Sequence, residues 1–378
     1  MTEWTECKIS DIGMVVGGAT PSTKKSENYE NGTIAWITPK DLSAFSGRYI
    51  RRGERNITET GLKSCSTQLL PKNTVLFSSR APIGYVAIAA NEVCTNQGFK
   101  SIVPNANTDA LFLYYLLKHN KDKIEGMGSG TTFKEVSGNI MKNIVVFVPT
   151  DKKVQETIAS VLGTIDDKIE ENERINNNLE QQADALYQTF FSTKSGIQGK
   201  IVTLDEYCSI FTGKKNANAS VNGGKYKFFT CAPEALQIDS YIFDGNAIIV
   251  SGNGAYTGRT RFYSGKFDLY QRTYACTLLD NVNPDFIFPL YWFVKLELSK
   301  KIMGGTRGSA IPYIVMNDLA KFEFIYNEEM FANYTPLFKS ITEAIQANEF
   351  ESENLAQIRD SLLPKLISGE LDVSDIEL

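Results

Sequence analysis

The chain has 378 residues, of which 42% are hydrophobic and 22% are charged, a composition typical of a globular protein with more than one domain. It lacks a run of about 18 apolar residues, and its acidic start has no signal-peptide core, so we expect a cytoplasmic protein without a membrane span. Six widely spaced cysteines and one histidine argue against a metal site, and the cysteines are expected to be reduced and mostly buried.

The net charge of −5 taken alone argues against a nucleic-acid ligand, but the charges are unevenly distributed. Residues 1–150 hold 17 basic and 13 acidic side chains, whereas residues 332–378 hold three basic and nine acidic ones. An acidic segment in one part of a chain does not prevent another part from binding an anion.

The first 150 residues are expected to form a mixed α/β body. Runs rich in Val, Ile, Phe and Trp, bounded by Gly, Pro, Asn or Ser, predict strands, and apolar residues at helical spacing predict a helix. The strands are expected at 34–37, 74–77, 84–88 and 144–148, the last one buried and ended by Pro149, and the helix at 111–123.

A long helix is predicted to follow this body. Apolar residues at alternating steps of three and four, from Ile158 to Leu186, form a heptad seam. About 40 residues would give a rod of about 60 Å at about 1.5 Å per residue. The small and polar stretch 192–199 is expected to be a linker.

The second half of the chain is predicted to contain the same kinds of element. Strands are expected at 247–250 and 322–326, and helices at 288–301 and 334–367, the latter broken only near its ends by Pro336 and Pro364.

This second half repeats the first. A shift of 174 residues aligns Ala81–Gly84 with Ala255–Gly258, and a shift of 178 aligns Gly130-Thr131 with Gly308-Ser309. A shift of 176 aligns the helical seams, pairing Ile165, Ile169, Asn172, Leu179 and Leu186 with Ile341, Ile345, Asn348, Leu355 and Leu362. We therefore predict a duplicated α/β (α+β) fold.

Each long helix has an apolar stripe that it cannot bury alone, and the simplest partner is the other copy. Antiparallel pairing would join the two bodies through two coiled-coil helices with pseudo-two-fold symmetry. Asn172 and Asn348 hold equivalent seam positions, where a buried Asn can fix the register of a coiled coil. The alternative is that both lie at an exposed edge.

The helical segments resemble the DNA-specificity (S) subunit of type I restriction–modification systems. The stretch from Leu362 to Leu371 is similar to the end of that family's distal helical region, and Val148 to Asp166 is similar to its central helical region. The chain departs from the family pattern at Val154 and at the entry to the second helix, Asn333–Pro336.

The resemblance implies a target recognition domain at 1–150, a central helical region with its linker at 151–200, a second target recognition domain at 201–331 and a distal helical region at 332–378. Each recognition domain would read one half of a split site in double-stranded DNA, and the helices would fix the gap between the halves. Two methyltransferase (M) subunits would dock and bring S-adenosylmethionine for adenine methylation. Restriction (R) subunits, if present, would bring ATP and Mg²⁺. The chain itself would bind no cofactor.

Candidate DNA contacts are basic or amide-bearing side chains on turn-rich segments, because Lys and Arg bind phosphates and Arg, Asn and Gln pair with base edges. An ordinary solvated loop is the alternative for each cluster. In the first body the candidates are Lys24, Lys25, Arg48, Arg51, Arg52, Arg55, Ser79 and Arg80.

In the second body, basic residues frame a Gly/Asn loop and follow a Gly-rich turn. The candidates are Lys214, Lys215, Lys225, Lys227, Asn253, Tyr256, Arg259, Arg261, Gln271, Arg272 and Arg307, with Asn253, Arg259, Gln271 and Arg272 as base readers. The Gly-rich loops 126–132 and 304–309 could hold a phosphate on their backbone amides or could simply be tight turns.

No catalytic motif is complete. Asn283-Pro284-Asp285-Phe286 lacks the second proline of the amino-methyltransferase motif Asn-Pro-Pro-Tyr/Phe, and the glycines of 252–258 are wrongly spaced for dinucleotide binding. We therefore predict a non-enzyme. The alternatives are a coiled-coil scaffold with two protein-binding heads, which the acidic net charge favours, and a degenerate methyltransferase, which the broken motif disfavours.

Overall fold

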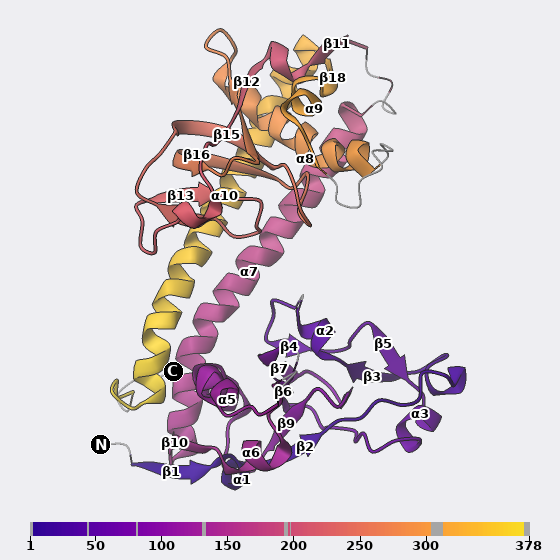
Figure 1. Cartoon of the computed structure of the whole chain (residues 1–378), viewed down its shortest axis with the longest axis vertical. Coiled ribbons are helices and arrows are strands. Elements are labelled where there is room, and N and C mark those ends of the chain that lie inside the picture. The colour runs from indigo at the N-terminus through magenta and orange to yellow at the C-terminus, as the bar shows by residue number, and fades with distance from the viewer. Residues whose placement is uncertain are drawn as a thin grey trace. The chain divides into compact units, whose positions relative to one another are not determined.

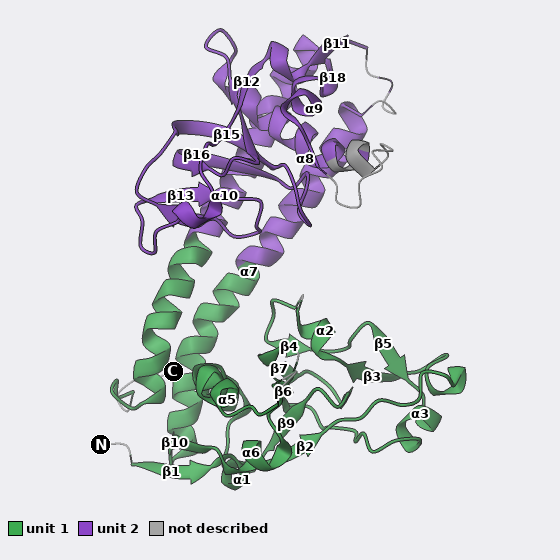
Figure 2. Ribbon diagram, viewed as in Figure 1, with its two compact units in different colours: residues 1–171, 351–378 green, residues 172–350 purple. Residues whose placement is uncertain are grey.

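A computed structural model of the chain describes residues 3–43, 45–80, 82–130, 134–192, 196, 198–303 and 313–373. The chain divides into two compact units, residues 1–171 with 351–378 and residues 172–350 (Figures 1 and 2). Each unit therefore contains one α/β body and one half of each of two long helices. Among the described residues, no helix combines the length and the apolar content that a membrane span requires.

The body of the first unit is built around a five-stranded sheet. Its order is β2 (Gly13–Gly17), β9 (Lys100–Pro104), β6 (Val75–Ser79), β7 (Ile83–Ala89) and β4 (Tyr49–Ile50). All neighbours are antiparallel except β4, which is parallel to β7. A smaller sheet has the order β5 (Arg55–Ile57), β3 (Ile34–Ile37) and β8 (Cys94–Thr95).

The central strand β6 is buried on both faces because its side chains alternate between two cores. Val75 and Phe77 join the core beneath helix α4 (Ala110–His119), whereas Leu76 joins the core on the other face of the sheet. Residues 112–117 of α4 are all buried, which explains its continuous apolar sequence. The short helices of this unit are α1 (Ile9–Ile12), η1 (Ser26–Asn28), α2 (Pro39–Ser43), α3 (Glu59–Lys63), α5 (Lys121–Gly126) and α6 (Gly138–Asn143).

Two predictions for this body were wrong in detail. The helix expected at 111–123 is two helices, because Asn120 ends α4 and its side-chain amide donates to the Leu116 carbonyl at 2.8 Å. The strand expected to be buried is β10 (Val145–Pro149), which pairs only with β1 (Trp4–Lys8) and leaves Val145 and Phe147 each 41% exposed. Pro149 lies within that strand rather than after it.

The body of the second unit repeats this architecture. Its sheet has the order β12 (Cys208–Thr212), β17 (Thr273–Leu278), β15 (Phe243–Ser251), β16 (Thr260–Leu269), β13 (Tyr226–Phe229) and β14 (Leu236–Ile238). The first four strands are antiparallel neighbours and β13 is parallel to β16, so the order and sense match those of the first sheet strand for strand until the extra β14. The predicted duplication is thus confirmed in the topology.

The smaller elements of the second unit follow the same plan. A two-stranded sheet of β11 (Lys200–Thr203) and β18 (Glu323–Tyr326) corresponds to β1 and β10, and helix α8 (Ile287–Met303) corresponds to α4. The remaining helices are η3 (Leu204–Glu206), η4 (Ala217–Ala219), η5 (Pro284–Phe286) and α9 (Met316–Ala320).

The two long helices are α7 (Lys152–Phe190) and α10 (Glu328–Ile367). Helix α10 begins at Glu328 rather than at Tyr334, and Asn327 accepts a hydrogen bond from the Met330 amide at its start. Neither proline breaks it. Around Pro336, the buried Phe331 and Phe338 hold this turn in the core and offset the hydrogen bond that proline cannot donate.

Within each unit the two helices run antiparallel. In the second unit, Asn172 is buried and donates to the Asn348 carbonyl at 3.4 Å, and Asn348 donates to Asn176 at 2.7 Å. In the first unit, Arg359 pairs with Asp166 at 2.7 Å. The predicted contact between the equivalent asparagines is confirmed, and a buried polar pair of this kind admits only one register.

Candidate nucleic-acid interface

Several loops of the second body meet at the turn formed by residues 270–272. The Gly252 amide donates to the Arg272 carbonyl at 2.9 Å, and the Gln271 amide donates to the Lys215 carbonyl at 3.0 Å. The Cys231 thiol lies 3.2 Å from the same Arg272 carbonyl. These bonds bring together the segments that carry most of the candidates of this body.

This meeting point is strongly basic. Lys214, Arg259 and Arg272 are exposed and form no ion pair with any other described residue. Arg261 lies over the Phe229 ring at 5.7 Å and donates to the Ala232 carbonyl. Burial, and then the nearby Arg259, lower the pKa of Arg261 below its ordinary value, although it stays a cation at neutral pH. Guanidinium groups without a carboxylate partner are suited to phosphates or guanine edges.

Other candidates of this body are differently placed. Lys215 is paired with the buried Asp268 at 2.8 Å, so its charge is already balanced. Lys225 and Lys227 belong to the β13 segment, where Lys227 pairs in register with Gln237 of β14. Half-buried Asn253 forms a bridge with Tyr313, exposed Tyr256 lies beside Arg259, and Arg307 falls outside the described residues.

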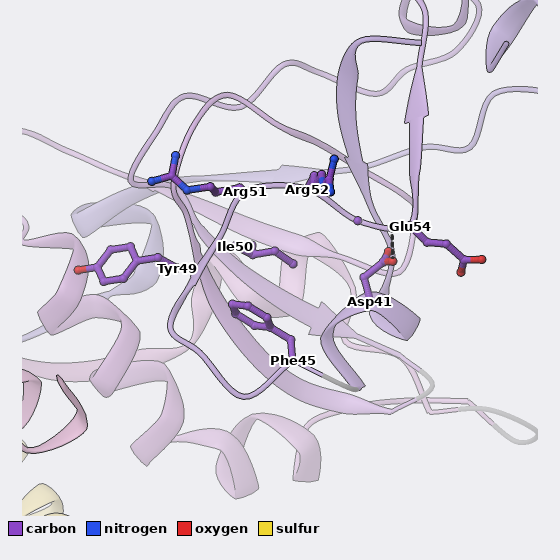
Figure 3. Close-up of a pocket in the computed structure, with 8 residues that line it drawn as sticks. Asp41, Phe45, Tyr49, Ile50, Arg51, Arg52 and Glu54 are labelled. Carbon is purple, nitrogen blue, oxygen red and sulfur yellow. Dashed lines mark hydrogen bonds between the residues drawn. The ribbon is translucent and has the colours of Figure 1, made fainter. Parts of the chain in front are cut away.

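In the first body, the arginine-rich segment lines a hollow of about 460 Å³ (Figure 3). Arg51 and Arg52 are exposed on its rim beside Tyr49 and form no ion pair within the described part of the chain. The Asp41 carboxylate accepts from the Glu54 amide at 2.7 Å and from the backbone and side chain of Thr38. That carboxylate holds the segment in place and is not available to a ligand.

The lysines and arginine flanking this hollow are also exposed. Lys25 lies 3.8 Å from Glu27, a weak surface pair, and Lys24 beside it is exposed. Arg55 stacks on the Tyr29 ring at 4.1 Å and keeps its guanidinium at the surface.

The end of strand β6 is less suited to DNA contact than we predicted. Ser79 is fully buried and donates to the Gly98 carbonyl at 3.1 Å. Arg80 lies 3.6 Å from Glu135, which also pairs with Lys100 at 3.1 Å. The prediction that Ser79 is displayed was wrong, because the turn at Gly98 covers it.

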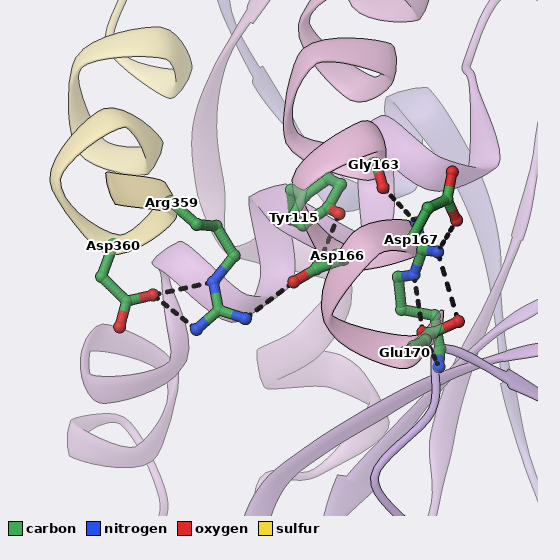
Figure 4. Close-up of polar contacts among 8 residues, drawn as sticks. Tyr115, Gly163, Asp166, Asp167, Glu170, Arg359 and Asp360 are labelled. Atoms are coloured by element: carbon green, nitrogen blue, oxygen red, sulfur yellow. Dashed lines mark hydrogen bonds and ion pairs between the residues drawn. The ribbon is translucent and has the colours of Figure 1, made fainter. Parts of the chain in front are cut away.

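The Arg48 side chain is 4% exposed and points into the first unit rather than toward solvent (Figure 4). It donates to Glu170 at 2.9 Å, to Asp167 and to the Gly163 carbonyl at 3.2 Å, all on α7. Burial opposes its charge, but the hydrogen bonds to Glu170 and Asp167 outweigh burial and hold the pKa of Arg48 above its ordinary value. The prediction that Arg48 contacts DNA is therefore corrected: it fastens the arginine-rich segment to α7.

A second polar contact lies one helical step away on α7. The Asp166 carboxylate accepts from the Tyr115 hydroxyl of α4 at 2.6 Å and from Arg359 of α10 at 2.7 Å (Figure 4). Burial and the adjacent Asp166 charge both raise the pKa of Tyr115, which stays a neutral donor. The segment 163–170 of α7 is thus bonded to the body on one side and to α10 on another.

Sequence reasoning missed one exposed side chain, Gln97. It lies on the turn before β9, as Gln271 lies on the turn before β17, and the Gly98 carbonyl accepts from the Ser79 amide as the Arg272 carbonyl accepts from the Gly252 amide. The shift of 174 residues that aligns Ala81–Gly84 with Ala255–Gly258 also aligns Gln97 with Gln271. That signal was present in the sequence.

The model of the type I restriction modification DNA specificity domain matches residues 1–181 and 198–326 of this chain. The MjaIX specificity subunit of Methanocaldococcus jannaschii is 31% identical over 99% of this chain and 95% of its own length, and the EcoDI specificity subunit of Escherichia coli is 41% identical over 33% of this chain and 27% of its own. The crystal structure of a type I restriction–modification S subunit from M. genitalium matches in fold, with a TM-score of 0.64 at 16% identity over 99% of this chain and 97% of that one.

The chain belongs to the family of type I restriction–modification DNA-specificity subunits. The family decides between the hypotheses left open by the sequence in favour of a non-catalytic DNA-recognition subunit, against a scaffold or a methyltransferase. Subunits of this family assemble with M and R subunits and bind DNA. Among the described residues, no group of three His, Cys, Asp or Glu side chains is placed to hold a metal ion.

We predict that Arg259→Ala combined with Arg272→Ala weakens DNA binding by the complex with M subunits and flattens its salt dependence. Two lost phosphate contacts would reduce the slope of log K against log salt by about 1.8, at about 0.9 per phosphate. The measurement is a salt titration of binding to a fluorescent duplex. Lys321→Ala is the control, because Lys321 is paired with Asp205 at 2.9 Å; an equal effect of both changes would contradict the assignment.

We predict that Arg48→Ala destabilises the first unit by about 2 kcal/mol. That is less than the roughly 3–5 kcal/mol typical of a broken buried pair, because Asp167 is 71% exposed and water can solvate it. Faster hydrogen–deuterium exchange at residues 163–170 would report the loss. Arg51→Ala, on the same segment but exposed, should change exchange little; comparable loosening by both would show that Arg48 is no anchor.

Proposed function

We propose that each body reads one half of a split site in double-stranded DNA and that α7 and α10 set the spacing between the halves. The observation that carries this proposal is the identical order and sense of the two sheets, each followed by a long helix. Two copies of one reader on a single chain are suited to a target with two separated parts. The continuity of α7 over 39 residues and of α10 over 40 residues supports a spacing role.

In this proposal the phosphates are held by exposed cations that no described carboxylate neutralises, and base edges are read by side chains on the same loops. Arg51 and Arg52 serve the first body, with Lys24, Lys25, Arg55 and Arg80 at its margins. Lys214, Arg259, Arg261 and Arg272 serve the second, with Lys215, Lys225, Lys227, Asn253, Tyr256 and Gln271 beside them. The acidic helices repel the DNA backbone and so favour contact through the bodies.

We further propose that two M subunits dock on the paired helices, each through an amphipathic helix. In the second unit, a groove of about 540 Å³ runs between α7 and α10 and is lined by apolar side chains that include Leu179, Leu186, Phe190 and Leu337. A groove of this shape, open and apolar, is suited to the apolar face of a helix. It also explains why Leu337 is 47% exposed.

The repeat supplies a second docking surface for a second M subunit. The shift of 176 residues places Val161, Ile165, Leu355 and Leu362 of the first unit at the positions of Leu337, Ile341, Leu179 and Leu186, and all four are half-buried. The M subunits would bind S-adenosylmethionine and methylate adenine, and R subunits would bind ATP and Mg²⁺. The chain would supply the address and no chemistry.

A heptad insertion tests the spacing role. Adding seven residues to both helices, between 171 and 172 and between 350 and 351, lengthens each by about 10.5 Å and keeps the seam in register. Mapping of methylated adenines should then show unchanged half-sites separated by about three more base pairs, at about 3.4 Å each. An unchanged spacer would refute the spacing role while leaving DNA recognition intact.

A charged substitution tests the docking groove. Leu337→Glu places a carboxylate in the apolar groove and should weaken assembly with M subunits at least tenfold, measured by sedimentation or isothermal titration. Ala347→Glu adds the same charge at an exposed position of the same helix and should assemble normally. Normal assembly of both variants would mean that the M subunits dock elsewhere.

A further inference from the structure

The two bodies share one feature in detail although their arginine surfaces differ. Gln97 and Gln271 are both exposed and both lie on the turn that enters the second strand of the main sheet, β9 or β17. The strand registers confirm the equivalence, since Ser78 pairs with Phe99 just as Ser251 pairs with Thr273. Each glutamine is the second residue before the paired position.

A glycine in each body lets a neighbouring loop cross this turn at very close range. A Cβ on Gly18 would lie 2.2 Å from the Thr95 carbonyl oxygen, and a Cβ on Gly213 would lie 1.7 Å from that of Leu269. Any other residue would push the loop away. Thr95 and Leu269 each stand two residues before the glutamine, so the same crossing is built twice.

The loop that crosses the turn then bonds to the glutamine side chain. In the first body, the Thr20 hydroxyl donates to the Gln97 amide oxygen. In the second body, Gln271 donates from Nε2 to the Asn216 side-chain oxygen at 2.9 Å. The residues that hold the two glutamines differ, yet both amides are held.

Each tether uses only part of the amide's hydrogen-bonding capacity. A glutamine amide has two N–H donors and an oxygen with two lone pairs. Thr20 uses one lone pair of Gln97, and Asn216 uses one N–H of Gln271, so each amide keeps at least one donor and one lone pair for a ligand. A donor and an acceptor side by side match the N7 and N6 edge of adenine in the major groove.

The repetition is selective. The exposed Arg272 beside Gln271 is replaced by Gly98 beside Gln97, and the cations of the two bodies occupy different loops. A side chain retained in both readers, while its neighbours diverge, points to a base that both halves of the site contain.

We propose that Gln97 and Gln271 each read an adenine, one in each half of the DNA site. This inference rests on the proposed function, in which each body contacts its own half-site. The tethers to Thr20 and Asn216 orient the amides before DNA binds, which reduces the conformational entropy lost on binding.

The test uses the complex of the full chain with M subunits and a duplex that carries its mapped methylation site. Each adenine in turn is replaced by 7-deazaadenine, in which a C–H replaces N7. We expect one adenine of the first half-site to cost the wild type about tenfold in affinity when replaced, and Gln97→Ala to abolish that penalty without affecting the second half-site. Gln271→Ala should do the reverse.

Two matched variants separate reading from a structural role. Gln97→Glu keeps an acceptor for Thr20 but removes the donor to N7, so it should behave as Gln97→Ala; Thr20→Val removes the tether and should keep the penalty. A penalty that persists in Gln97→Ala and Gln271→Ala, equal weakening on every duplex, or no sensitivity to N7 in the wild type would overturn the proposal. If the wild type failed to distinguish its mapped site from a scrambled duplex, the proposed function itself would fail.

Discussion

The antiparallel packing of α7 against α10 is the constraint on which the remaining structure depends. Neither helix can bury its stripe alone, and in both units the body's core closes over the pair. In the second unit, Phe191 of the α7 end packs with Phe331 and Phe338 of α10 in one aromatic cluster. In the first unit, Leu366 and Ile367 of α10 join Ile158 and Leu162 of α7 in the core beneath α4. The long helices are therefore parts of both cores.

The acidic character of these helices has a structural use that net charge conceals. Asp167 and Glu170 hold Arg48 of the first body, Asp166 holds Arg359, and Glu180 pairs with Lys295 of the second body at 2.6 Å. Helix carboxylates thus neutralise the basic residues that face inward. The cations that remain without a described partner lie on the loops, where a polyanion can reach them. A negative total charge and a DNA-binding surface are compatible for this reason.

Much of the fold could be predicted because it is written in local patterns. Strand β3 was placed to the residue, β6 and β7 to within two residues, and the duplicated topology followed from the shift between matched segments. Periodicity cannot reveal whether a strand has a covering layer, which is why exposed Val145 and Phe147 were taken as buried. It also could not show that Phe331 and Phe338 would keep α10 helical through Pro336.

The candidate site was less predictable, because the availability of a charge depends on partners far away in sequence. Arg48 and Arg51 are three residues apart, yet only Arg48 finds carboxylates more than 100 residues away. Ser79 looked displayed because the covering turn at Gly98 is nearly 20 residues distant. Gln97 could have been found from the internal repeat, since aligned positions in two readers compare one sequence with itself.

The claim that each body reads its own half-site is tested most directly by a chain that carries one body twice. Residues 201–331 are replaced by a second copy of 1–150, and methylated adenines are mapped in cells that express this chain with the M subunit. The account predicts a split site in which the half-sequence of the first body occurs on both sides of the spacer. Retention of the original second half-sequence, or methylation at unsplit sites, would contradict it.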